Sequence, residues 1–137
     1  MDTDIAIKLL EFISVCPDLP ITKELFLIDD LSKDKCMSLR MHEGTVLQQD
    51  IDGYKQIQYP FMLLYKDTSA KSPEDRSEMM AVLNKIGAWM EAQALPKFPN
   101  MTWEQISQTA YSSASIMEKE ENTYIAGYTL ILSNLSN

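Results

Sequence analysis

Residue types that bind metals or form nucleophile–base pairs are scarce in this sequence of 137 residues. It holds two cysteines, Cys16 and Cys36, and a single histidine, His42. A structural zinc site needs four Cys or His ligands in closely spaced pairs, so these three residues cannot build one. We expect two small buried thiols and no cofactor. A nucleophile pair of Cys36 with His42 is the alternative, although nothing supplies an orienting third group or an oxyanion loop.

Glycine and arginine are also rare. The four glycines stand apart from one another, so the chain has no Gly-rich loop that could cradle a phosphate. Arg40 and Arg76 are the only arginines, and the lysines are scattered, which leaves no basic cluster for nucleic-acid phosphates. With 12 basic and 20 acidic side chains, the formal charge is −8. This charge predicts that nucleic acid is repelled or passes freely, without specific binding.

Long apolar runs are absent, and none approaches the roughly 18 residues of a membrane span. The acidic start of the chain, Met1 to Asp4, lacks the basic region of a secretory signal. We therefore expect a soluble intracellular product with no membrane partner. The apolar fraction of 45% is typical of a globular domain, and the chain is long enough for one core. We expect a single domain over residues 1–137.

Two segments have the spacing of amphipathic helices. Residues 4–15 place apolar side chains on one stripe, and Pro17 ends the segment. The second helix begins at Ser72-Pro73, which combines an N-cap hydroxyl with proline at the first helical position. Apolar residues at spacings of three and four then predict a helix from about Pro73 to Gln93.

Other segments have the pattern of strands or hairpins. Residues 25–28 are a buried strand or a helix fragment, because so short a run does not distinguish the two. Asp52-Gly53 predicts a tight hairpin turn. Pro60, in the strand after this turn, cannot donate a ladder hydrogen bond, so its side of the strand is predicted to be an edge or a bulge. The remaining extended segments are 36–41, 56–65, 103–112, and a last hairpin from 116 to 132. Runs of strands around one long helix predict an α+β fold, with an antiparallel sheet of about four to six strands and two helices packed on one face.

Acidic pairs are the one group of side chains suited to acid–base catalysis or magnesium binding. These are Asp29 with Asp30, Glu43 with Asp50, and the acidic run at 118–121. Adjacent side chains on a strand point to opposite faces, and a charged hairpin tip is ordinarily solvated. We therefore expect neither catalytic nor metal-binding residues among them.

The six tyrosines lie mostly on predicted strands. Any that lie on the open face of the sheet would suit a protein interface, where aromatic anchors dominate the binding energy. Together with the hairpin turn, the candidate interface residues are Asp52, Gly53, Tyr54, Tyr59, Tyr124 and Tyr128.

The order of these segments resembles a family of minor capsid or tail-completion proteins from tailed phages and prophages of Gram-positive bacteria. The resemblance rests on six segments: a short N-terminal helix that ends near Cys16-Pro17, Val46 to Gly53 as Val-x-x-x-x-Ile-Asp-Gly, the aromatic strand Tyr59 to Tyr65, Ile86 with Trp89-Met90-Glu91, Leu95-Pro96, and Tyr124 to Tyr128. It extends from about Ile5 to Leu132, and its motifs are structural. The segment Lys33 to Met41 departs from the pattern and receives no role.

The resemblance implies a tail terminator-like fold and a structural role in the virion, after synthesis in the cytoplasm of the bacterial host. Relatives of this architecture assemble as rings, often of six copies, at the head-proximal end of the tail. The implied partners are further copies of the chain, the tail tube and the head-connector proteins. DNA would pass through the ring, and the family has no catalytic residues to carry over.

Two other functions fit the residues. One is a small cytosolic hydrolase or ligand-binding domain with an acidic cleft near Asp50 and His42, which predicts a deep pocket with convergent polar groups. The other is a cytosolic adaptor that binds a partner peptide on its open sheet face. A ring-forming protein instead predicts flat apolar edges and no enclosed cavity.

Overall fold

The computed structural model describes residues 2–30, 32–68, 72–98, 101–108, 115–116 and 123–133. Its two α-helices are α1 (Asp2–Ile13) and α2 (Pro73–Ala92), and a 3-10 turn, η1, spans Lys23–Leu25. The strands are β1 (Phe26–Ile28), β2 (Lys35–Met41), β3 (Thr45–Gln49), β4 (Lys55–Asp67), β5 (Lys97–Phe98), β6 (Met101–Gln108), β7 (Ser115–Ile116) and β8 (Thr123–Ser133).

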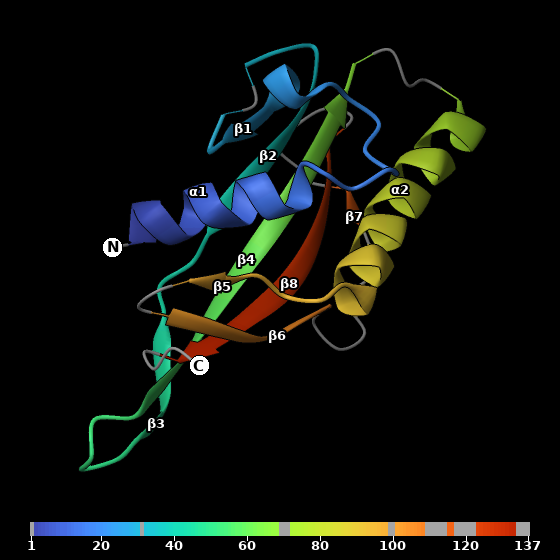
Figure 1. Ribbon diagram of the computed structural model, residues 1–137. Coiled ribbons are helices and arrows are strands. Elements are labelled where there is room, and N and C mark those ends of the chain that lie inside the picture. Colours follow the sequence, from blue (N-terminus) through green and yellow to red (C-terminus); the bar gives the residue numbers. More distant parts are fainter. Residues whose placement is uncertain are drawn as a thin grey trace.

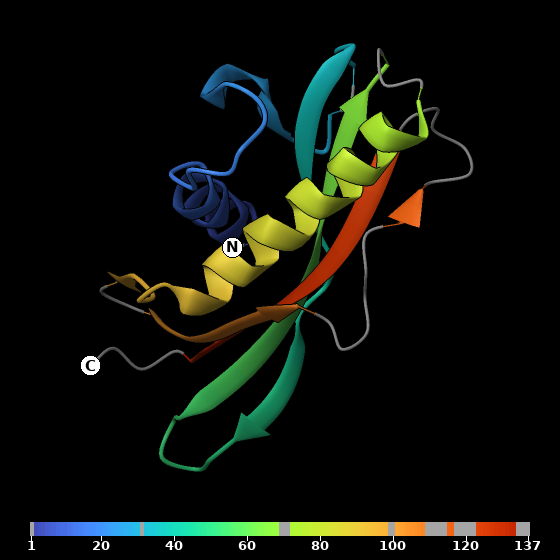
Figure 2. The ribbon, with the colours of Figure 1, turned by 90° about the vertical axis from the view of Figure 1, so that its right-hand side faces the viewer.

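These strands form one sheet in the order β1-β2-β4-β8-β6-β5, while β3 pairs with β4 and β7 pairs with β8. Both helices lie on one face of this sheet (Figures 1 and 2). The predicted α+β fold is therefore confirmed. Among the described residues, six strands form the continuous row of the sheet, as many as predicted, and the hairpin partners β3 and β7 pair beside this row. The pair β1–β2 is parallel, which corrects the expectation of a wholly antiparallel sheet.

The helix α1 covers β1 and β2 with the stripe that its spacing predicts. Ile5, Leu9 and Ile13 are buried at helical spacing, whereas Glu11 is exposed. This stripe buries apolar area that would otherwise contact water, so packing on the sheet stabilises a helix too short to persist alone.

The helix α2 lies across β4, β8 and β6 and begins as its sequence predicts. The Ser72 side chain accepts a hydrogen bond from the backbone N–H of Asp75, and Pro73 occupies the first turn. Its buried residues are Met79, Leu83, Ile86 and Met90. No helix in the described part of the chain is long and apolar enough to cross a membrane.

An aromatic cluster joins the two helices to the sheet. The ring of Phe12 on α1 lies 5.5 Å from that of Trp89 on α2 and 5.9 Å from that of Trp103 on β6, measured between centroids. Aromatic pairs at these separations attract beyond their area of contact. The cluster therefore fixes how α1 sits relative to α2.

The long strand β4 is central, between β2 or β3 on one side and β8 on the other. Pro60 lies in its interior, where β2 has ended opposite Phe61 and β3 has begun opposite Gln58. The Pro60 carbonyl accepts a hydrogen bond of 2.9 Å from the N–H of His42, so its missing N–H faces this gap. The predicted interruption beside Pro60 is confirmed, because Pro60 has no N–H to return a bond to His42 and the pairing of β2 with β4 ends at this point.

Several sequence predictions need adjustment. Residues 25–28, predicted as a strand or a helix fragment, contain both: η1 ends at Leu25, and β1 follows directly. The strand predicted at 103–112 is β6 and ends at Gln108, and 109–112 lie outside the described residues. The last hairpin contains β7 and β8 as predicted, while its tip at 118–122, with the acidic run, lies outside the described residues.

Candidate protein interface

A hairpin projects from the body of the molecule beyond the ends of the other strands (Figures 1 and 2). It consists of β3, the connecting turn and the first residues of β4, and we call residues 45–58 the arm. Along the arm β3 pairs only with β4, from Thr45 opposite Gln58 to Gln49 opposite Lys55. On the other side of β4, pairing with β8 stops at Gln56. At the tip of the arm, β4 therefore pairs with β3 alone among the described strands.

The arm exposes apolar side chains to solvent. All five residues of β3 are exposed; Val46 and Leu47 keep 47% and 46% of their area accessible, and Ile51 at the tip is fully exposed. These three make up half of the six large hydrophobic residues exposed in the described chain. Exposed apolar groups gathered on one projection are typical of an interaction surface.

The turn at the tip has the backbone that Asp52-Gly53 predicts. The N–H of Gly53 donates to the carbonyl of Asp50 at 3.2 Å, and the N–H of Asp50 donates to the carbonyl of Tyr54 at 2.8 Å. Gly53 has a φ of 99°, a left-handed value that glycine adopts without strain. This is a three-residue hairpin loop, which holds the strands in register and keeps Ile51 outward.

The outer edge of β3 offers unpaired backbone groups, since no other described strand pairs with it. Edge strands of this kind are templates for pairing with another chain. A bulge between Val46 and Gln48 twists this edge but does not cover it.

Gly44 lies at the junction where the chain leaves β2 and enters the arm. A Cβ atom at this position would lie 2.5 Å from the ring of Tyr59, closer than packed atoms approach. Tyr59 is 95% buried, so its ring has little room to move aside. The absence of a side chain at Gly44 therefore lets the arm pass over the core.

The arm is tied to β6 through Glu104, at the end of the arm next to the turn. Its carboxylate accepts hydrogen bonds from the Tyr54 hydroxyl at 3.3 Å and from the Gln56 amide at 3.0 Å. Partial burial, and then the negative charge of Glu104, raise the pKa of Tyr54. The hydroxyl therefore keeps its proton at neutral pH and remains a donor, which orients the arm relative to the sheet.

The structure divides the six predicted interface residues into two groups. Asp52 and Gly53 are exposed at the tip, and Tyr54, directly after the turn, is half-buried. The remaining three are core residues, at 5% exposure or less: Tyr59, Tyr124 and Tyr128. Their expected role as exposed anchors is therefore corrected.

The reason for this correction is the pleat of the sheet. Tyr128 pairs with Phe61 and stacks on its ring at 5.3 Å on the face that α2 covers, and its hydroxyl donates to the Leu83 carbonyl at 2.8 Å. Alternation predicts that such residues share a face, but not which face the helices cover. Val46, Leu47 and Ile51 take the exposed positions instead, and the adjacent apolar pair in β3, which breaks alternation, was the signal that could have found them.

The face of the sheet opposite the helices is the second exposed surface. Half-buried side chains, both apolar and polar, lie in its centre, and they include Met62, Ile125, Thr129 and Ile131. Further along it, Leu64 is fully buried and the Ser38 hydroxyl accepts a hydrogen bond from the N–H of Asp30. This face is mixed in character, and its central apolar side chains are half-buried, whereas Val46, Leu47 and Ile51 of the arm are exposed.

The residues named for a catalytic cleft do not converge. His42 precedes β3 and Asp50 follows it, which separates them by roughly 20 Å or more along an extended strand. Both are exposed, and Cys36 is buried at the far end of β2 from His42. Cys16 and Cys36 are buried free thiols, as predicted. In the described residues, no three His, Cys, Asp or Glu side chains lie close enough to hold a metal ion.

Comparison of the sequence with known protein families and with curated proteins finds no match. The assignment of function therefore depends on the geometry of the chain and on its sequence pattern.

Proposed function

We propose that this protein is a structural component of a tailed phage or prophage, a minor capsid or tail terminator-like protein that caps the tail tube and contributes to head–tail joining. It acts without catalysis, in the virion, and self-associates into a ring. Its partners are further copies of itself, the tail tube and the head connector.

The arm is the observation that carries this proposal. A projecting hairpin with a fully exposed Ile51 and an unpaired strand edge gives each subunit a means to reach its neighbour. A hairpin that contacts the next subunit makes a head-to-tail interface, and such interfaces close into rings when the rotation permits. The resemblance of the sequence pattern and the charge of −8, which suits a lumen that DNA passes through, support the same role.

The test is the mass of the full chain in solution, measured by light scattering after size exclusion over a wide range of concentration, with negative-stain imaging of large species. The wild type is expected to form closed rings as concentration rises. The variant Leu47→Ser with Ile51→Ser removes two apolar contacts. Because burying one such side chain contributes about 1.5–3 kcal/mol, association should weaken about tenfold or more for each.

The matched control is Ile7→Ser with Val15→Ser, which removes two exposed apolar side chains, 43% and 67% accessible, from the region of α1. This control should assemble like the wild type. A wild-type chain that stays monomeric at every concentration would contradict self-assembly, and equal loss in both variants would contradict the role of the arm.

A further inference from the structure

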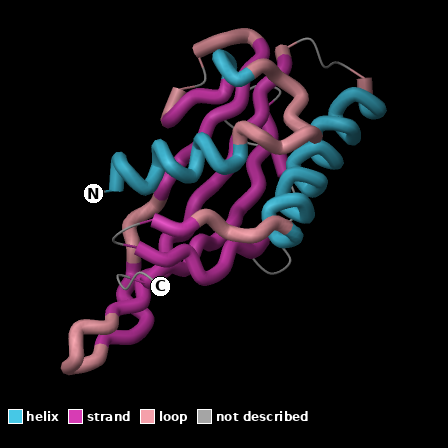
Figure 3. The backbone as a smooth tube through the Cα atoms, in the orientation of Figure 1, coloured by secondary structure: helices cyan, strands magenta, loops and turns pink. Residues whose placement is uncertain are grey.

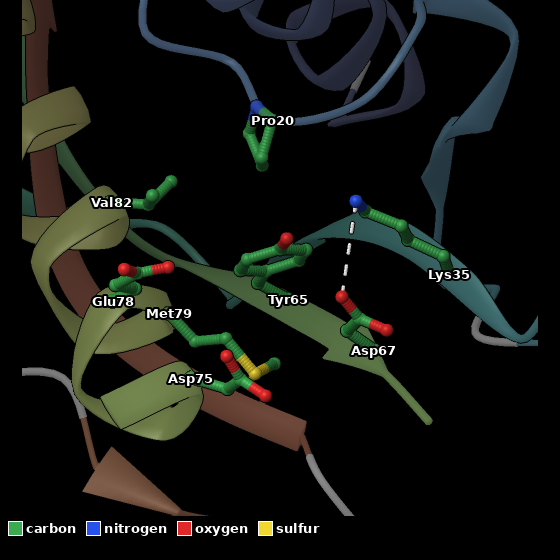
Figure 4. A pocket seen from close by; sticks show the side chains of 8 residues that line it. All are labelled: Pro20, Lys35, Tyr65, Asp67, Asp75, Glu78, Met79 and Val82. Carbon is green, nitrogen blue, oxygen red and sulfur yellow. Dashed lines mark ion pairs between the residues drawn. The ribbon is translucent and has the colours of Figure 1, made fainter. Parts of the chain in front are cut away.

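A cavity of about 310 Å³ lies between the first turns of α2 and the ends of β2 and β4 (Figure 4). Its residues Tyr65 and Asp67 lie at the end of β4 opposite to the arm, which contains the first residues of that strand. Its volume is at the lower end of the range of small-molecule sites. Neither Asp50 nor His42 lines it, so it is not the cleft that the sequence predicted.

Carboxylates dominate the charge of this cavity. Asp67 lines it from β4, and Asp75 and Glu78 line it from α2, where they are three residues apart. Lys35 is the one cationic side chain in the lining, and its Nζ lies 3.8 Å from Asp67 Oδ2. Three negative charges against one positive charge favour a cationic ligand.

Lys35 indicates which kind of cation the Asp67 end accepts. Its side chain is 48% exposed and reaches in from the rim, so this long ion pair is weak and replaceable. Asp75 and Glu78, in contrast, have no ion-pair or hydrogen-bond partner for their carboxylates in the described part of the chain. The carboxylates therefore form two ends of the cavity. Asp67 is at one end, paired with the Lys35 ammonium, and Asp75 and Glu78 are at the other end.

Tyr65 stands between the two ends with its hydroxyl directed into the cavity (Figure 4). The residue is 96% buried, and its hydroxyl has no hydrogen-bond partner among the described residues. Burial, and then the charge of Asp67, raise its pKa to about 12, so the hydroxyl is neutral and its lone pairs can accept. Because the hydroxyl faces the cavity, it is available to accept a hydrogen bond from a ligand N–H.

Three apolar side chains also line the cavity. They are Pro20, Met79 and Val82, and side chains of this kind pack against methylene groups. Two separated anionic ends together with these apolar side chains match a flexible organic cation better than a single compact ion.

We propose that this cavity binds a linear aliphatic diamine or polyamine. One ammonium group lies at Asp75 and Glu78, the methylene chain packs against the apolar side chains of the lining, and the second ammonium takes the place of Lys35 at Asp67. The Tyr65 hydroxyl accepts a hydrogen bond from the bound amine. This inference is independent of ring formation, because no residue of the cavity belongs to the arm.

The test is calorimetric titration of the full chain with cadaverine at constant ionic strength. Cadaverine should bind at one site per chain, and its single-charged analogue pentylamine should bind at least tenfold more weakly. Magnesium chloride and the uncharged diol of the same chain length should give no saturable binding. Tyr65→Phe should weaken cadaverine binding about tenfold, since a hydrogen bond to a charged group is lost. This substitution breaks no bond within the described protein, so folding should persist, and circular dichroism checks that it does.

The paired charge variants are Glu78→Gln and Glu74→Gln. Both remove one carboxylate from the first turns of α2, but Glu74 does not line the cavity. Glu78→Gln should weaken cadaverine binding about three- to tenfold, and Glu74→Gln should leave it unchanged. Absence of saturable cadaverine binding, equal binding of pentylamine, saturable binding of magnesium, or equal effects of the two variants would each overturn the proposal.

Discussion

Tyr65 and Tyr128 occupy the same face of the sheet, yet their hydroxyl groups meet different surroundings. Tyr128 is 1% exposed and donates to the Leu83 carbonyl, which links β8 to α2 inside the core. Tyr65 is 4% exposed and meets a cavity with carboxylates around it. At the scale of the residue, one tyrosine contributes to stability through a satisfied hydrogen bond, whereas the other keeps an unused acceptor.

Replacing Tyr65 by phenylalanine should reduce the amount by which the free energy of unfolding falls at alkaline pH. The pKa of Tyr65 is raised to about 12 in the folded protein from 10 in the unfolded chain. The folded state therefore favours the protonated hydroxyl, and this stabilisation is present below pH 10 and is lost as pH rises to about 12. Between about pH 9 and 11, the wild type should lose about 1 kcal/mol more than Tyr65→Phe.

Urea unfolding followed by circular dichroism at each pH measures this difference. Lysines also titrate in this range, but they do so in both proteins, so the comparison cancels them. Parallel profiles for the two proteins would mean that Tyr65 ionises as easily in the folded chain as in the unfolded one.

At the scale of the element, the arm depends on how β2 passes into β3. The two strands lie on the same side of β4, and residues 42–44 span the gap between them. Pro60 and Gly44 suit this gap for different reasons. Pro60 accepts a bond from the His42 N–H but has no N–H to return, so the ladder with β2 ends there, and Gly44 lacks the Cβ that would meet Tyr59. Gly44 and Pro60, which lie just outside the two ends of the arm, thus position it.

Gly44→Ala should destabilise the protein and displace the arm. The added methyl group would approach the buried Tyr59 ring to 2.5 Å, and overpacking of a core costs about 1–3 kcal/mol. Urea unfolding measures the loss, and Thr45→Ala, at the exposed neighbouring position, is the control and should differ little from the wild type. A Gly44→Ala variant as stable as the wild type would show that the chain shifts at this junction without cost.

At the scale of the whole molecule, two helices and one sheet enclose a single connected core. Buried residues of α1, α2, β2, β4, β6 and β8 all belong to it, and the cluster of Phe12, Trp89 and Trp103 joins the helices. The arm projects at one end of the sheet (Figure 3), and the cavity residues Tyr65 and Asp67 lie at the other end of β4. The same rigid strand therefore supports the surface proposed for assembly and the site proposed for an amine.

The chain should unfold in one cooperative transition, as expected for a single domain over residues 1–137. Tryptophan fluorescence reports on the contact between α1, α2 and β6, and far-ultraviolet circular dichroism reports on the whole fold. Both signals should give the same midpoint in urea, since two-state domains show coincident transitions. Separate midpoints would divide the chain into independently unfolding parts.

Local features of this protein were determined by the sequence itself. Ser72-Pro73 caps α2 and Gly53 turns the arm because each depends only on neighbouring backbone groups, which the sequence specifies directly. The α+β class followed from the order of such elements. The role of Pro60 was also predictable, since a missing N–H has the same consequence in any sheet.

Other features were decided only by the tertiary structure. Tyr59, Tyr124 and Tyr128 are core residues because both helices pack on their side of the sheet, and no local pattern specifies which side is covered. The strands β1, β5 and β7 exist because longer neighbours pair with them. The cavity at Tyr65 brings together residues from β2, β4 and α2 that are distant in sequence, and such a meeting requires the packed fold.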